Sequence, residues 1–192
     1  MNNFFSIFNK KLAELIRIEK NLAKKLMLCA DVFKNVGISK KKIIFIVNGA
    51  SSAISSHVSV DLSKNAKIRA VNFNESDLIT CLTNDYGTEE WMKEALKMYC
   101  DKDDVVVLIS SSGMSKNIVN AAKWCIKSKI SFITFTGNKK NNNLKKINKK
   151  GLNFWVNSKA YNHVELVHLY WLLSIVDFII GKIVYKVSIP SK

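Results

Sequence analysis

Short apolar runs alternate with helical stretches along most of this chain, and the alternation restricts the folds open to it. The runs that read as strands are IIFIVN at 43–48, IRAVNF at 68–73, DVVVLIS at 104–110, SFITFTG at 131–137 and LNFWVNS at 152–158. Such β-rich runs suit strands that are buried on both faces, as in parallel sheets. Five strands are too few for a closed eight-stranded barrel. We therefore predict an α/β fold, a doubly wound three-layer sandwich with about five parallel strands.

Helical periodicity predicts long helices at both ends of the chain. Apolar side chains recur at helical spacing over residues 5–36, and a second long pattern runs from about 162 to 185. The chain has a single proline, in its tail, and no linker-like stretch. We treat 1–192 as one domain, with an N-terminal helical region at 1–40 and an α/β core with the C-terminal helix at 41–185.

Cysteine usage and the terminal segments bear on location. The four cysteines form no CxxC pair and lie among apolar residues, which predicts reduced thiols and a cytoplasmic protein. The first residues, MNNFFSIFNKK, show no signal-peptide pattern. The apolar segment LVHLYWLLSIV is well below the roughly 18 residues that a membrane span requires. We expect a buried or interface helix there and no membrane partner.

The charge of the chain is strongly positive, formally +15 at pH 7. One interpretation is a surface that binds nucleic acid or another anionic partner. The other is a solvated surface rich in lysine and asparagine, as in KKNNNLKKINKK at 139–150. The lysines are spread widely, and no RNA-binding, zinc-finger or basic-zipper signature is present. We therefore expect no nucleic-acid partner, and only a weak attraction for phosphorylated ligands.

The turn after the third strand is unusually rich in serine: VLISSSGMSKNIVNAA at 107–122. A turn that opens a helix presents unpaired backbone N–H groups and the positive end of the helix dipole, which favour a phosphate. Serine hydroxyls add donors, and Gly113 lets the backbone approach the ligand. A single N-cap serine would explain one of these serines but not four. No nucleotide-binding GxxxxGK[ST] or GxGxxG motif is present, so nucleotide phosphates are not favoured here.

Four motifs follow one another along the chain: NGASS, CLTNDYG, VLISSSGMSKNIV and FITFTGN. In order and spacing they resemble the sugar isomerase (SIS) domain family, and within it the phosphoheptose isomerase group, with its GNGGS, GNDFG, STSGNS and TLTG segments. The resemblance covers about residues 5–185. It implies the sandwich already predicted, with strand order 2-1-3-4-5, and a homotetramer with active sites at subunit boundaries.

The resemblance also implies roles for individual residues. The residues that would bind the phosphate of a phosphorylated sugar are Ser51, Ser110, Ser112 and Ser115. Asn48 and Asp85 would contact the sugar hydroxyls. Taken alone, Asp85 reads as a residue that ends or caps a helix, and its place in NDYG is what favours a binding role.

Isomerisation through an enediol needs a base and an acid. The family's glutamate falls on Asp61, its glutamine on Glu165, and its catalytic histidine on Leu173, which cannot carry a proton. We take Asp61 and Glu165 as the candidate catalytic residues, and we expect these two carboxylates to lie close enough for one to raise the pKa of the other. His168 does not share the helix face of Leu173 and reads as a hydrogen-bonded structural histidine.

Some family members hold zinc at this site, although the reaction requires no cofactor. Here His57 and Asp61 are four residues apart on one predicted helix face, so they could share a ligand. With Glu165 they form a candidate metal set, and zinc is a possible metal. His163, near the start of the last helix, reads as a surface or capping residue.

Three functions remain open at this point. The first is a phosphosugar isomerase, acting on sedoheptulose 7-phosphate or a similar sugar, in the biosynthesis of lipopolysaccharide or capsule. The second is a non-catalytic SIS protein that binds a phosphosugar or another protein such as a replication initiator, as Leu173 suggests. The third is a nucleic-acid-binding protein, which rests on charge alone and predicts binding that weakens steeply with salt. We favour the first.

Overall fold

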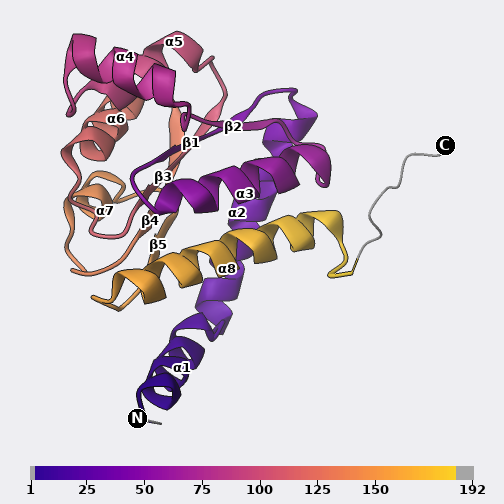
Figure 1. Ribbon diagram of the computed structural model, residues 1–192. Helices are drawn as coiled ribbons and strands as arrows, with labels where there is room; N and C mark the ends of the chain where they lie inside the picture. The colour runs from indigo at the N-terminus through magenta and orange to yellow at the C-terminus, as the bar shows by residue number, and fades with distance from the viewer. Residues whose placement is uncertain (1–2, 185–192) are drawn as a thin grey trace, which may run out of the picture.

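The apolar runs form one parallel sheet in the computed structural model, which describes residues 3–184 (Figure 1). The strands are β1 (Ile43–Val47), β2 (Ala70–Asn72), β3 (Val105–Ser110), β4 (Ser131–Thr136) and β5 (Asn153–Trp155). Their order is β2-β1-β3-β4-β5, and all neighbours pair in parallel. The predicted fold class and strand order are confirmed.

Alternate residues of the central strands face opposite layers, because successive side chains of a strand point to opposite faces. In β1, Phe45 packs into one cluster and Ile44 into the other, and both are fully buried. One layer contains α2 (Lys20–Ile38), α3 (Ser51–Lys64) and α8 (Tyr161–Ile180). The other contains α4 (Ser76–Tyr86), α5 (Trp91–Tyr99), α6 (Lys116–Lys127) and α7 (Asn143–Ile147). This two-sided burial explains why the strands read as continuous apolar runs.

The terminal helices differ from their predicted extents. The N-terminal region is two helices, α1 (Asn3–Ile16) and α2, with a break between them, and α1 extends away from the sandwich (Figure 1). At the other end, α8 stops at Ile180 because Gly181 adopts a left-handed φ of 79°, which ends helices. The predicted end at Tyr185 was too late, and Tyr185 itself lies outside the described residues.

The lysine-rich run at 139–150 was expected to be solvated surface, yet it contains α7. The Asn142 side chain caps this helix by accepting from the Lys145 amide at 2.9 Å, and Leu144 is fully buried. The lysines of the run stay at the surface, as expected, while the polar composition concealed the buried side chains of Asn142, Leu144 and Asn148 that anchor it.

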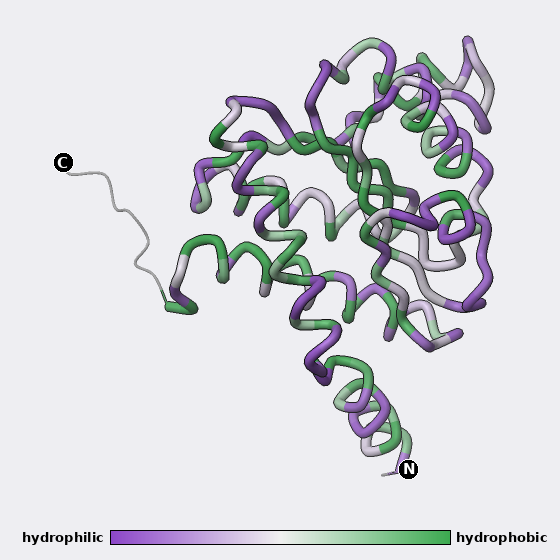
Figure 2. The backbone as a smooth tube through the Cα atoms, turned by 180° about the vertical axis from the view of Figure 1, so that it is seen from behind, coloured by the Kyte–Doolittle hydropathy of each residue, from purple (hydrophilic) through white to green (hydrophobic). Residues whose placement is uncertain are grey.

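The length and hydropathy of α8 would allow a membrane span, because the helix extends beyond the apolar segment LVHLYWLLSIV at both ends. Its mean hydropathy over 18 residues is 1.5. Eight of its residues are buried, and it packs against α2 and α3. Figure 2 shows apolar residues, in green, along the strands and along α8. A core helix of a water-soluble protein has the same features, so α8 is weak support for a span.

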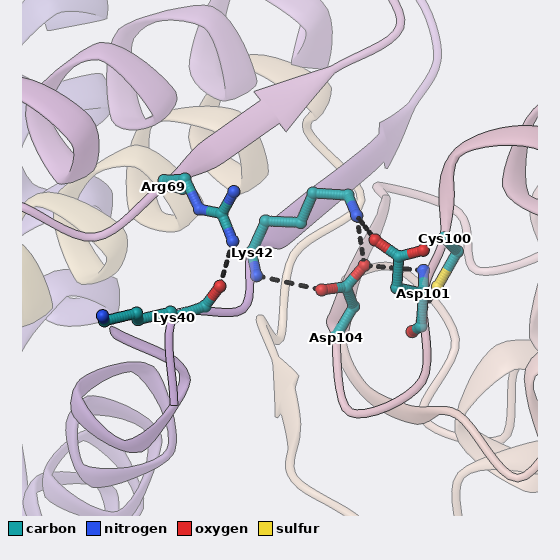
Figure 3. Close-up of polar contacts among 6 residues, drawn as sticks. All are labelled: Lys40, Lys42, Arg69, Cys100, Asp101 and Asp104. Atoms are coloured by element: carbon teal, nitrogen blue, oxygen red, sulfur yellow. Dashed lines mark hydrogen bonds and ion pairs between the residues drawn. The ribbon is translucent and has the colours of Figure 1, made fainter. Parts of the chain in front are cut away.

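At the amino-terminal edge of the sheet, a buried ion pair ties β1 to β3 (Figure 3). The Lys42 ammonium lies 2.6 Å from Asp104, whose side chain is only 1% exposed, and 2.7 Å from the exposed Asp101. The Asp104 carboxylate also accepts from the backbone amides of Lys42 at 2.9 Å and Asp101 at 2.8 Å. The Asp104 carboxylate therefore fixes both the segment before β1 and the loop before β3.

Asp104→Asn is expected to lower the free energy of unfolding by about 3 kcal/mol, because it leaves the Lys42 charge without its buried partner. Asp101→Asn removes an exposed partner of the same lysine and should change stability little. Urea denaturation of both variants measures the difference. Equal losses in the two variants would show that burial of Asp104 is unimportant.

Candidate active site

A cavity of about 230 Å³ lies at the carboxyl-terminal edge of the sheet, where the loops after β1 and β3 meet the start of α8. Parallel α/β sheets hold their ligands at this edge. The residues that line it are Asn48, Gly49, Ala50, Ser51, Ile109, Ser110, Ser111, Ser112, Ser115, Tyr161 and Glu165. Six of the residues singled out from the sequence therefore lie around one cavity: Asn48, Ser51, Ser110, Ser112, Ser115 and Glu165.

The serine loop (residues 110–115) carries most of the hydroxyl groups of the cavity. The Ser110 and Ser115 hydroxyl oxygens lie 3.3 Å apart. Ser110 accepts from the Gly113 amide at 3.1 Å, and Ser112 from the Met114 amide at 3.2 Å. Ser115 stands at the N-cap position of α6, yet its side chain makes no capping hydrogen bond. Its hydroxyl group is thus available to a ligand, and a purely capping role does not describe it.

Gly113 shapes this loop in two ways. Its φ is 65°, a left-handed value that glycine adopts without strain. A Cβ atom here would also lie only 2.2 Å from the Asn142 side-chain oxygen. Asn142 is fully buried and held in place by hydrogen bonds to Lys139 and Lys145. The serine loop therefore packs directly on Asn142, the N-cap residue of α7. In addition, the Leu144 amide of α7 donates to the Gly113 carbonyl oxygen at 3.0 Å.

Two helices begin at this cavity. The first turn of α3 starts at the buried Ser51, and α6 starts at Lys116, directly after Ser115. Each N-terminus offers unpaired amides and about half a positive charge. Two such ends beside a cluster of hydroxyl groups make the cavity suited to an anion, above all a phosphate.

Asn48 is held by a neighbour that the sequence did not indicate. The Asn48 and Asn117 side-chain amides donate to each other, at 2.9 and 3.0 Å. This double contact fixes the orientation of Asn48 at the end of β1. The one feature of the sequence that could have pointed to Asn117 is its place in the first turn of α6, two residues after Ser115.

Glu165 is the only acidic side chain among the lining residues of the cavity. Burial raises the pKa of its carboxyl group, and interaction with the Ser111 hydroxyl partly opposes the rise. Close approach of α8 to the end of β4 depends on Gly137, because a Cβ atom there would lie 2.7 Å from Val164 and 3.0 Å from the Ser111 carbonyl oxygen. A half-buried carboxyl group with a raised pKa holds a proton more readily than an exposed one, which suits a group that exchanges a proton with a substrate.

Asp61 is not beside Glu165 within the chain. It lies ten residues after Ser51 on α3, roughly 15 Å along the helix. The imidazole ring of His57 is next to Asp61, with Nε2 3.4 Å from the Asp61 carboxylate. Its acidic neighbour is Asp177, whose pKa is raised first by burial and then by the Asp61 charge. Within one chain the two carboxylates are not neighbours, so the expected pairing of Asp61 with Glu165 stays a prediction for the assembled protein.

The metal set His57, Asp61 and Glu165 is likewise not brought together. Within residues 3–184, no three side chains of histidine, cysteine, aspartate or glutamate are grouped as a metal site requires. The pair His57 and Asp61 alone supplies two ligands at the far end of α3. The sequence mapping placed all three residues by their order along the chain, which does not fix distances between helices.

Asp85 and Leu173 also lie away from the cavity lining. Asp85 is exposed near the end of α4, and its contacts are with Asn84 at 3.0 Å and Cys81 at 3.8 Å. Leu173 packs against the core cluster between the sheet and α8. Besides Asp61, the cavity of this chain alone therefore lacks Asp85 and the position of the family's histidine.

The histidines of α8 are both buried. His168 is fully buried, and its Nε2 lies 3.2 Å from the Thr136 carbonyl oxygen, to which it donates. Burial lowers the pKa of His168 to about 4. The structural role expected for His168 is confirmed. The surface role expected for His163 was wrong, because Phe8 of α1 covers its ring at 4.3 Å between centroids.

His168 makes stability depend on pH. Its pKa is about 4 in the folded protein and about 6.5 when unfolded, so the unfolded chain binds the proton more readily. The contribution is present above pH 6.5 and is lost as the pH falls toward 4, at most about 3 kcal/mol. Urea denaturation from pH 7 to 4.5 should show this decline, and His168→Gln should reduce its slope. An imidazole resonance of His168 that titrates near pH 6.5 in the folded protein would contradict this.

No family model matches the sequence. The phosphoheptose isomerase of Buchnera aphidicola subsp. Acyrthosiphon pisum (strain Tuc7) is 31% identical over 142 residues, which cover 71% of this chain and 71% of that protein. The phosphoheptose isomerase of Campylobacter concisus (strain 13826) is 25% identical over 143 residues, 71% of this chain and 74% of that protein.

Two solved structures share the fold. Phosphoheptose isomerase GmhA from Neisseria gonorrhoeae has a TM-score of 0.79 at 22% identity, with 91% of this chain and 98% of that chain covered. A phosphoheptose isomerase from Francisella tularensis has a TM-score of 0.81 at 20% identity, with 94% and 96% covered. At these identities the structural likeness supports the architecture.

Proposed function

The chain belongs to the phosphoheptose isomerase family, and from this premise we propose that it is an aldose–ketose isomerase of phosphorylated sugars in surface-sugar biosynthesis. The substrate class is sedoheptulose 7-phosphate or a similar sugar phosphate. The observation that carries the proposal is the cavity in which the serine loop and two helix N-termini surround a site next to the Glu165 carboxyl group.

In this proposal the phosphate occupies the serine loop, with Ser51, Ser110, Ser112 and Ser115 as donors. Asn48, fixed by Asn117, orients a sugar hydroxyl. The sugar then extends toward Glu165. A cavity of about 230 Å³ is smaller than the roughly 300 Å³ at the lower end for small-molecule sites, so one chain encloses only part of the substrate.

The chemistry is a proton transfer between neighbouring carbons. Glu165, ionised, takes a proton from the carbon beside the sugar carbonyl, and the carbonyl oxygen takes up a proton from solvent water, which leaves an enediol. The protonated Glu165 returns its proton to the former carbonyl carbon while the other oxygen releases its proton to water, so the carbonyl moves by one position. Its raised pKa makes the Glu165 carboxylate a stronger base than that of an exposed glutamate.

Asp61 remains part of the proposal through assembly. On α3 and α8, Ser51 and Glu165 mark the cavity end, whereas Asp61 and Asp177 mark the other end. A two-fold contact that pairs these helices antiparallel with a second copy brings the far end of one copy toward the cavity of the other. We therefore propose a homotetramer with sites at subunit boundaries. Asp61, and with it any zinc at His57, would act there.

Exposed apolar side chains support this assembly: Val60, Leu166, Tyr170 and Phe178 on α3 and α8, and Phe4, Phe5 and Ile7 on α1. Single apolar side chains scattered over a surface are normal, but several exposed on the same helices are typical of a protein–protein contact. Mixed tetramers of Asp61→Asn and Glu165→Gln subunits should regain part of the activity that each variant lacks, because some sites would then hold both native carboxylates. Light scattering that finds only monomers at micromolar concentration would contradict the assembly.

The non-catalytic alternative is not favoured. Leu173 argued for it, yet the cavity keeps a half-buried acid beside the serine loop, and the similar proteins are phosphoheptose isomerases. Location in the cytoplasm, as reduced thiols would require, and the absence of a nucleic-acid partner remain part of the proposal.

Ser115→Ala tests phosphate binding by the serine loop. The expected result is about tenfold weaker binding of sedoheptulose 7-phosphate, because one hydrogen bond to a charged group is lost. Helix stability should not change, since the hydroxyl makes no capping bond. Titration calorimetry measures both variants, with Ser128→Ala at the other end of α6 as the control. Unchanged affinity in Ser115→Ala would place the phosphate elsewhere.

A further inference from the structure

A second and larger cleft, of about 700 Å³, lies between the α1–α2 junction on one side and helix α7 and the edge strand β5 on the other. It shares no lining residue with the candidate active site. We name it the basic cleft after the basic residues that line it: Arg17, Lys25, Lys140, Lys145, Lys146 and Lys149. Four of them come from the lysine-rich run at 139–150, and the fold places Arg17 and Lys25 of the N-terminal helical region beside that run.

The positive charge of the basic cleft is not compensated by the protein. Six bases face two acids, Glu14 and Glu19, an excess of four. Glu14 is already paired with Lys11 at 3.1 Å. Among residues 3–184, none of the six bases lies within 4.0 Å of a carboxylate oxygen. Like charges held together without partners favour an anion in the cleft.

Lys145 is the innermost of these charges. Its ammonium lies 5.3 Å from the centre of the Trp155 ring. Burial lowers the pKa of Lys145, and the charges of Lys140 and Lys25 lower it further. A bound anion would relieve both effects, because it offers the ammonium a partner in place of the lost water.

The floor of the cleft is polar as well. Asn153, Trp155 and Trp171 line it, and each has a buried polar atom without a hydrogen-bond partner among the described residues: Asn153 Oδ1, Trp155 Nε1 and Trp171 Nε1. Trp171 is only 4% exposed. Indole N–H groups donate, and the amide oxygen accepts. Because these three atoms are buried, they lie behind the surface of the cleft, and the basic side chains are the polar groups that a ligand would meet first.

We propose that the basic cleft binds a small molecule with two or more phosphate groups, such as a nucleoside di- or triphosphate or a sugar nucleotide. A phosphate monoester carries only about two negative charges, fewer than the excess of four bases. A volume of about 700 Å³ holds a whole small molecule. The ligand would touch α7, the same helix whose Leu144 amide donates to Gly113 of the serine loop.

The test uses inorganic pyrophosphate and ATP as probes, at about 0.15 M salt so that loose attraction is screened. Tryptophan fluorescence reports binding, because Trp155 and Trp171 line the cleft whereas Trp91 and Trp124 lie on α5 and α6. The expected result is saturable binding below millimolar concentration. ATP binding tighter than pyrophosphate would assign part of the affinity to the nucleoside, and equal binding would assign it to the phosphates alone.

Matched variants locate the site. Lys145→Gln combined with Lys149→Gln should weaken binding at least about tenfold, the loss expected when charge-assisted hydrogen bonds are removed. Lys123→Gln combined with Lys127→Gln removes the same charge from α6 and should leave binding unchanged, as should Ser115→Ala. Absence of saturable binding, equal losses in both lysine pairs, loss in Ser115→Ala, or much tighter binding of a single-stranded oligonucleotide would each overturn the proposal.

Discussion

Glu165→Gln is expected to lower turnover of a ketose phosphate by at least about a hundredfold, the low end of the effect of a general acid or base. Glutamine keeps the size and hydrogen-bonding shape of the side chain but cannot exchange a proton. Binding of the sugar phosphate should stay within about twofold, because the proposed phosphate site is the serine loop, on a different element from Glu165. Steady-state kinetics and titration calorimetry of one preparation separate the two effects.

The pH profile supplies a second readout for Glu165. The carboxyl group must be ionised to act as a base, so kcat/KM should fall as the pH drops through its raised pKa. This acidic limb should be absent from the residual activity of Glu165→Gln. Glu75→Gln, which changes an exposed acid at the start of α4, serves as the control and should behave like the native chain. Full turnover in Glu165→Gln would remove Glu165 from the mechanism.

Gly113→Ala is expected to disable the phosphate site and to cost about 3 kcal/mol or more of folding stability. The left-handed backbone accounts for about 1–2 kcal/mol of this. The new methyl group would also meet Asn142 at 2.2 Å, and Asn142 cannot move without losing the cap of α7. Displacement of the loop should weaken phosphosugar binding at least about tenfold.

Gly181→Ala is the matched control for Gly113→Ala. Gly181 has a left-handed φ of 79°, but nothing lies within 4 Å of a Cβ atom there. It should lose only the backbone contribution and bind the sugar phosphate normally. Thermal unfolding and calorimetry of both variants measure the difference. If the two variants behave alike, contact between the serine loop and Asn142 has no role in the site.

The sequence was sufficient for the sheet and for the residues that line the candidate site. Runs such as IIFIV and VVVLIS are buried along their whole length, and short apolar runs that alternate with helical patterns are typical of parallel strands between two helical layers. Parallel strands end at a common edge, so residues that follow them in sequence, such as Asn48 and Ser110, must converge. This is why most of the candidate site was predictable from the residues.

Contacts between helices were not predictable in the same way. Asp61 could be placed on a helix, but the 1.5 Å rise per residue carries it away from Glu165, and only the structure shows Asp177 as its neighbour. His163 is buried because Phe8, from the other end of the chain, packs on it. The lysine run at 139–150 was visible in the sequence, but its meeting with Arg17 and Lys25 to form the basic cleft was not, since those residues come together only through the fold.

Turnover of sedoheptulose 7-phosphate by the purified native protein, followed by NMR with and without added zinc, tests the central claim most directly. The proposed function predicts conversion to the corresponding aldose phosphate, with saturation kinetics and loss of the activity in Glu165→Gln. Micromolar binding of the sugar phosphate with no conversion of this or any other ketose or aldose phosphate, in either condition, would contradict it and would favour a phosphosugar-binding protein instead.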